Sequence, residues 1–150
     1  MKKLLIVVVA LAAVGLYQTF SDKGGSFDTS SSSSSSLDLH DSSAISRAFE
    51  EHADGVPVEG QGVVVKLLPD DNQGSRHQRF IVQLESGQTI LIAHNIDLAS
   101  RVSPLSEGAL VSFSGEYAWN PKGGVVHWTH RDPDGTHIAG WVRSNGKVFQ

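Results

Sequence analysis

The segment between His127 and His137 concentrates the residue types that carry chemistry. It reads His-Trp-Thr-His-Arg-Asp-Pro-Asp-Gly-Thr-His and holds three of the chain's seven histidines, together with a tryptophan and two acids. Neutral imidazoles with a carboxylate can bind a divalent transition metal, and the same groups can serve as general acid and base. The spacing matches no established metal signature, so it predicts a polar site without identifying a metal or a reaction.

Strand geometry limits which of these side chains can meet. Neighbouring residues on a strand point to opposite faces, so His127 and His130 are expected to diverge unless the strand ends between them. The turn-forming sequence Asp-Pro-Asp-Gly that follows favours such an end. Asp132 could then orient His130, and His137 could return from the turn toward both. The alternative interpretation is structural, because histidines near strand ends often serve only as hydrogen-bonding residues.

Two polar clusters upstream supply further candidates. The loop from Asp70 to Arg79 holds two adjacent acids, two arginines and a histidine, which could bind an ion or pair with one another as a solvated turn. The cluster His94–Asp97 either extends the site or caps a helix. Both tryptophans among the candidates are expected to pack in the core or at its rim rather than to stack on a ligand. The principal site candidates are His77, Arg79, His94, His127, His130, Asp132 and His137, and the secondary candidates are Asp70, Asp71, Arg76, Asn95, Asp97, Trp128 and Trp141.

The pattern between these clusters is that of short strands. A proline cannot donate to a sheet ladder, so Pro69 is expected to end the first strand. Asn145-Gly146 predicts a tight C-terminal hairpin, and one short helical turn is expected over residues 97–102. No long helical periodicity separates the strands, which argues against a parallel sheet. The expected strands cover residues 61–68, 78–84, 89–94, 111–119, 125–130, 141–143 and 147–149.

The order of these elements predicts a mainly β domain over residues 56–150. The expected order is three strands, a short connection, two strands and a hairpin, which is the order of a five-stranded OB-type barrel. A small β-sandwich is the alternative. In such a barrel the loops over residues 69–77 and 120–124 flank the binding face. A two-residue turn at Ser86-Gly87 predicts one hairpin register. That register pairs Phe80 with Ala93, Val82 with Leu91 and Arg79 with His94, and leaves His77, Arg79 and His94 on the face opposite the core residues Phe80, Val82, Leu84, Leu91 and Ala93.

The first 55 residues differ in composition from this domain. Two lysines precede an uninterrupted apolar run over residues 4–16, which is typical of an export signal. We favour an uncleaved membrane anchor over residues 1–20, because no clear cleavage site follows, and a secreted protein is the alternative. Residues 21–55 include seven consecutive serines and predict a flexible tether with a short helix, within residues 37–53, that packs on the domain. The expected location is a bacterial inner membrane, with the domain in the periplasm or outside the cell.

Composition excludes several classes of function. The chain has no cysteine, so it forms no disulfide, thiolate nucleophile or cysteine-based zinc site. The net charge of −4 arises mainly before the domain, and the domain itself is nearly neutral. Binding of nucleic acid through charge alone is therefore not expected. The sequence also lacks a P-loop, a dinucleotide-binding fingerprint and the nucleophile elbow of serine hydrolases.

Four motifs resemble the bacterial family called DUF3465. They are Asp70–Phe80, His94–Ala99, Gly115–Asn120 and Gly123–Pro133, and the resemblance closes with Gly140-Trp141 and covers about residues 58–150. The family has no assigned activity, so the resemblance implies only a small exported or membrane-anchored bacterial domain. Arg131 stands where the resemblance predicts a further histidine, which argues against that position as a metal ligand.

Three functions remain open from the sequence. The leading hypothesis is a binding module for a small ligand or metal ion in the cell envelope. The second is a metal-dependent hydrolase of the phosphodiesterase or nuclease type, with histidine ligands and with Arg76 or Arg79 holding a phosphate. The third is a structural or interaction protein of the envelope. The metal hypotheses require at least three of the candidate side chains within about 2.0–2.2 Å of one point.

Overall fold

The computed structural model describes residues 35–150, with side chains from Ser43 onward. The anchor predicted at residues 1–20, and the predicted tether up to residue 34, lie outside the described residues. Within the described part of the chain, no helix is long and apolar enough to cross a membrane.

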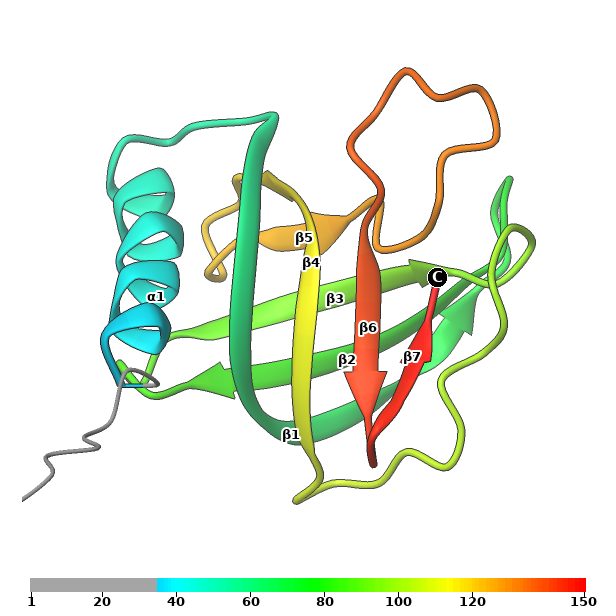
Figure 1. The fold of residues 1–150 in the computed structure, drawn as a ribbon, viewed down its shortest axis with the longest axis horizontal. Helices are drawn as coiled ribbons and strands as arrows, with labels where there is room; N and C mark the ends of the chain where they lie inside the picture. The colour runs from blue at the N-terminus through cyan, green and yellow to red at the C-terminus, as the bar shows by residue number, and fades with distance from the viewer. Residues whose placement is uncertain (1–34) are drawn as a thin grey trace, which may run out of the picture. The chain divides into compact units, whose positions relative to one another are not determined.

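The described chain is mainly β, as predicted, with a single helix before the strands. The helix α1 spans Ser35–Glu50, so the helix expected within residues 37–53 is present and begins inside the serine run. The strands are β1 (Val56–Asp71), β2 (His77–Leu84), β3 (Thr89–Asn95), β4 (Leu110–Ala118), β5 (Val125–His127), β6 (Trp141–Ser144) and β7 (Lys147–Phe149) (Figure 1).

Five strands hydrogen-bond in a closed ring, in the order β1-β2-β3-β5-β4 and back to β1. The strand β1 closes the ring because its first half pairs with β4 and its second half pairs with β2. The change of partner occurs at Gly62, where a Cβ would lie 2.2 Å from the carbonyl oxygen of Gln83, so only glycine fits. The hairpin β6–β7 extends the sheet outside the ring by pairing β6 with β4. Asn145 and Gly146 have the positive φ values that the predicted tight turn requires.

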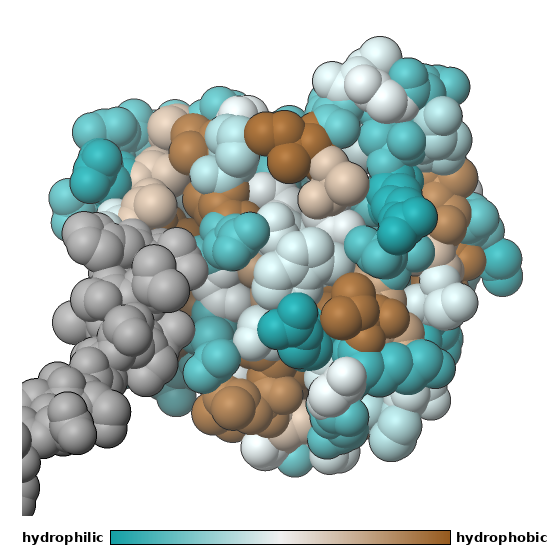
Figure 2. Space-filling model, in the orientation of Figure 1, coloured by the Kyte–Doolittle hydropathy of each residue, from teal (hydrophilic) through white to brown (hydrophobic). Residues whose placement is uncertain are grey.

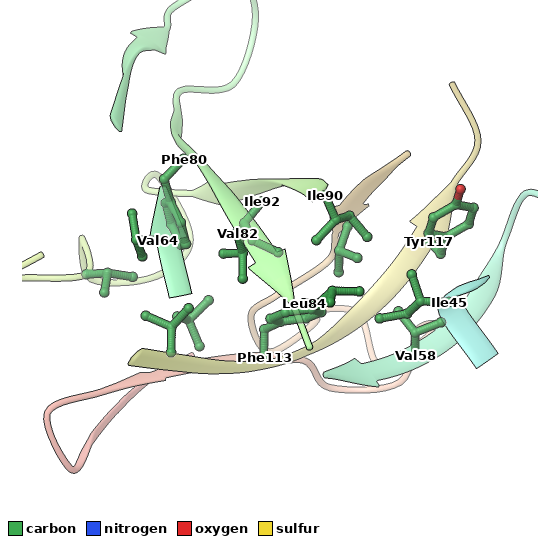
Figure 3. Packing of buried hydrophobic residues seen from close by; sticks show 14 of the residues in the cluster. Ile45, Val58, Val64, Phe80, Val82, Leu84, Ile90, Ile92, Phe113 and Tyr117 are labelled. Atoms are coloured by element: carbon green, nitrogen blue, oxygen red, sulfur yellow. The ribbon is translucent and has the colours of Figure 1, made fainter. Parts of the chain in front are cut away.

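The core lies inside this ring and consists of alternate residues of each strand (Figure 3). Burial of each large apolar side chain contributes roughly 1.5–3 kcal/mol, so these residues supply most of the stability. The helix covers part of the core through Ile45 and Ala48. On the face shown in Figure 2, hydrophobic residues form separate brown patches among teal ones rather than one continuous apolar surface. The largest fully buried side chains include Tyr117, Phe80, Phe113, Ile45, Ile90 and Ile92.

Three predicted element boundaries are wrong for identifiable local reasons. The strand β1 continues past Pro69, because its register with β2 shifts between Leu68 and Asp71 and takes the proline out of the regular ladder. The strand β5 ends at His127, because Trp128 has a φ of 53° that takes the chain out of the extended conformation. The connection after β3 holds one hydrogen-bonded turn, closed by the Ala99 amide on the Asn95 carbonyl at 3.1 Å, so the single helical turn expected over residues 97–102 begins two residues earlier.

The predicted register of the β2–β3 hairpin is wrong by one residue. The amide of Leu84 donates to the carbonyl of Gln88 at 2.9 Å, so the turn has three residues, and Gly87 takes the left-handed conformation with a φ of 85°. Arg79 therefore lies opposite Ala93, and His94 lies opposite Gln78. A shift of one residue reverses the faces of a strand. As a result Ile90, Ile92 and His94 are buried, whereas Leu91 and Ala93 are only partly buried.

Candidate functional site

Both ends of the loop over residues 128–140 pack closely against the backbone of β4. Trp128 holds a φ that bulky residues rarely adopt, and such strain costs about 1–3 kcal/mol. A Cβ on Gly115 would lie 2.3 Å from the carbonyl oxygen of His127, and one on Gly140 would lie 2.0 Å from that of Trp128. Glycine at these two positions therefore allows the strained backbone to pack directly on β4.

Asp132 shapes this loop rather than orienting His130. Its Oδ1 accepts the amide of Asp134 at 3.0 Å, and its Oδ2 accepts the amides of Thr136 at 2.6 Å and His137 at 2.8 Å. The hydroxyl of Thr136 donates to the same oxygen at 2.8 Å. These hydrogen bonds, led by that from the Asp134 amide, hold the pKa of Asp132 well below its usual range. His130 instead bonds through Nδ1 to the carbonyl of Arg131 at 2.7 Å.

The loop returns His137 to β4, where it meets a carboxylate. Its ring stacks on Trp128 with centroids 3.8 Å apart and an interplanar angle of 12°. Its Nδ1 lies 3.4 Å from Oε2 of Glu116, and Nε2 of His127 lies 3.7 Å from Oε1 of the same residue. Partial burial lowers the pKa of His127, and the Glu116 carboxylate opposes that shift. The structure thus places one carboxylate between two imidazoles and beside an indole.

Glu116 is the residue that the sequence reasoning missed. It lies directly opposite His127 in the antiparallel pair of β4 and β5. The signal was present, because the two predicted strands flank a short turn, and pairing them brings these two residues together. The predicted meeting of His130, Asp132 and His137 does not occur in this form, whereas His127 and His137 do converge.

His94 is a buried structural residue. Its side chain is fully buried, with Nε2 3.1 Å from the carbonyl oxygen of Ser100 and Nδ1 2.9 Å from the hydroxyl of Thr129. A carbonyl oxygen only accepts, so Nε2 carries the proton and Nδ1 accepts from Thr129. Burial is the main cause that lowers the pKa of His94. A neutral imidazole with both nitrogens engaged has no lone pair left for a metal.

The remaining candidates form local contacts or ion pairs with nearby residues. Arg76 binds both oxygens of Asp97, through its side-chain Nε and its backbone amide, each at 2.7 Å. These bonds lower the pKa of Asp97. Exposed ion pairs of this kind contribute little to stability because solvent screens them. The other contacts pair Arg101 with Asp70, Arg79 Nε with the Pro69 carbonyl, His77 Nδ1 with the Ser75 carbonyl, Asp71 with the Gln73 amide, Asn95 with the Asp97 and Leu98 amides, and Trp141 with the guanidinium of Arg143.

A groove of about 510 Å³ lies beside the Glu116 cluster. It is walled by α1, by β1 and β4, and by the loop, and its floor includes Gly115. The charged residues that line it are Glu59 and Glu116, and among the described residues no lysine or arginine does so. His137 and Trp128 form one wall. Nowhere in residues 43–150 are three or more histidine, aspartate or glutamate side chains grouped so that they could hold a metal ion.

Replacing Asp132 with alanine is expected to release this wall. The amides of Asp134, Thr136 and His137 lose their acceptor, so their hydrogen exchange should accelerate about tenfold or more. NMR exchange at neutral pH measures this, with Asp134→Ala as the control that keeps the acceptor. Because the folded pKa of Asp132 is depressed, the carboxylate keeps these bonds at neutral pH and loses them only as the pH falls well below 4. Unchanged exchange at all three amides would contradict the assignment.

Comparison with known proteins supports one identification. A search of curated proteins gave no match. A family model described as "Protein of unknown function (DUF3465)" matches residues 28–150, which is most of the chain. The chain therefore belongs to the DUF3465 family.

Proposed function

We propose that this protein is a binding module for a small organic molecule, held in the groove beside Glu116. The observation that carries the proposal is the pairing of Glu116 with His137, which line a groove of about 510 Å³ together with the indole of Trp128, while His127 contacts the other oxygen of Glu116 from outside the groove lining. Pockets for small molecules combine apolar and aromatic walls with a few convergent polar groups. Here Pro57, Ile138 and the indole of Trp128 supply the apolar and aromatic walls. The Glu116 carboxylate and the His137 imidazole supply the polar groups.

The proposal extends to the fold and the location. The strand order of the ring supports an OB-type barrel, with one hydrogen-bonded turn in the connection after β3. The groove lies over β1 and β4, whereas OB-type modules bind on the face of their second and third strands, so the site is argued from its own geometry. The location we propose is the cell envelope, which rests on the apolar run over residues 4–16.

A small organic molecule is favoured over a metal or a phosphodiester. A metal-dependent hydrolase needs three ligands and an open coordination position, and the described residues offer no such group. The two carboxylates that line the groove also repel phosphate. A role in structure or protein interaction alone would leave the groove without a ligand, which the following experiment tests.

The proposal predicts that small molecules bind at the groove and that filling it abolishes binding. We would titrate the full chain with a panel of small cationic, neutral and anionic compounds and follow the NMR signals of Trp128, Thr136 and Ile138. Ala44→Trp places an indole in the groove and should weaken binding at least tenfold, or about 1.4 kcal/mol. Arg47→Trp, one turn further along α1 and outside the groove, is the matched control. The proposed function is wrong if no compound shifts the groove signals, or if both variants bind equally.

A further inference from the structure

We infer that the groove selects a cation, an amine or a guanidinium, and that this ligand competes with protons for Glu116. The inference rests on the proposed function, because it names the ligand class for the same groove. Its basis is that Glu116 contacts two imidazoles, one through each carboxylate oxygen. When these histidines are neutral, they leave the negative charge of the carboxylate uncompensated.

Charge around the groove favours a positive ligand. Glu116 and Glu59 contribute negative charge, and no described lysine or arginine lines the groove to neutralise it. The indole of Trp128 also lines the groove, and aromatic rings attract cations through their faces. One face of this indole is covered by His137. A cation in the groove can therefore contact a carboxylate and lie near an aromatic ring at once.

The two imidazoles make this binding depend on pH. Protonated His127 and His137 would each form an ion pair with Glu116, which satisfies the carboxylate without a ligand. The groups that face or influence this cluster are Glu59 from β1, His77 from β2 and His130 from the loop. Positive charge on His77, His130 or His137 lowers the pKa of His127. Protonation of the imidazoles therefore neutralises the Glu116 carboxylate, and their deprotonation leaves it available to an external cation.

The linkage between ligand and protons is reciprocal. If a protonated imidazole excludes the cation, then a saturating cation must in turn disfavour protonation of the imidazole, and the ring signals of His127 should report this as titration at a lower pH. Because a protonated imidazole pairs with Glu116 in place of the ligand, acidification from about pH 8 to about pH 5.5 should weaken cation binding by about tenfold. A purely structural role for the cluster predicts no such coupling, since no ligand would compete for the carboxylate.

The experiment uses three probes of equal chain length. They are 1,5-diaminopentane, 1,5-pentanediol and glutarate, supplemented by butylguanidinium and butylamine, all titrated into the full chain. Primary amines and guanidinium groups remain charged between about pH 5.5 and pH 8, so only the protein titrates. We expect the cations to bind at least tenfold more tightly than the diol or the diacid, and to bind about tenfold more tightly at pH 8 than at pH 5.5.

Variants separate this inference from the proposed function. Glu116→Gln keeps the shape of the side chain and should remove both the preference for cations and its pH dependence. Glu51→Gln, on an exposed residue beyond the end of α1, should leave both unchanged. If neutral or anionic probes bind the groove as tightly as the cations, the inference is overturned while the proposed function stands. Cation binding that is independent of pH, or retained in full by Glu116→Gln, also overturns it.

Discussion

Replacing Gly140 with alanine is expected to lower the free energy of unfolding by about 3 kcal/mol, because the added methyl group has no space. A Cβ at this position would lie 2.0 Å from the carbonyl oxygen of Trp128 and 2.6 Å from that of Ser114. Both atoms belong to the backbone, so neither can rotate away as a flexible side chain would. Relief requires the loop to move off β4, which also separates His137 from Glu116. Urea denaturation of the full chain measures the loss.

The same loop provides a matched control. Gly135 has a φ of +67°, but a Cβ there would meet no atom within 4 Å. Gly135→Ala should therefore cost only the strain of a left-handed alanine, about 1 kcal/mol. Gly140 itself has no left-handed φ, so equal losses from the two substitutions would show that the close approach at Gly140 costs no more than the strain at Gly135. Such a result would contradict the packing of the loop on β4.

The arrangement of strands was largely predictable, because alternation in the sequence reports which face is buried. Phe80, Val82 and Leu84 were expected on the core face of one strand, and all three are buried in the core. The register of β2 and β3 was not predictable in the same way. It depends on whether the turn uses two or three residues, and Ser86-Gly87 is compatible with both. The left-handed conformation of Gly87 selects the longer turn, and that single residue moves His94 from the surface into the core.

The sequence indicated two of the histidines of the candidate cluster but not the carboxylate that they contact. The histidine-rich segment does carry the candidate site, through His127 and His137. The carboxylate that joins them, Glu116, comes from a neighbouring strand and is visible only once β4 is paired with β5. Asp132 was expected to orient His130, but its carboxylate instead accepts hydrogen bonds from amides of the same loop. Aspartate commonly accepts hydrogen bonds from backbone groups a few residues ahead, and these form within the loop without any tertiary contact.

His94 illustrates how a residue type that suggests chemistry can instead serve stability. Its burial between Thr129 and Ser100 predicts that His94→Ala lowers the free energy of unfolding by about 3 kcal/mol. The loss combines a cavity with two polar groups that lose their partner. Thermal and urea denaturation would measure it. A loss below about 0.5 kcal/mol, which is usual for surface substitutions, would contradict the buried position.

The pH dependence of stability provides a second and independent test of the same residue. Burial lowers the folded pKa of His94, so below about pH 6.5 the unfolded chain binds a proton that the folded chain does not. Stability should therefore fall as the pH decreases from about 6.5 toward the folded pKa, with a slope of up to about 1.4 kcal/mol per pH unit. His94→Gln retains a donor and an acceptor but does not titrate, so it should show a shallower slope. Some slope should remain, because the pKa of His127 is also lowered by burial. Identical slopes for the wild-type chain and His94→Gln would mean that His94 is accessible to protons in the folded state, which the two hydrogen bonds to its ring exclude.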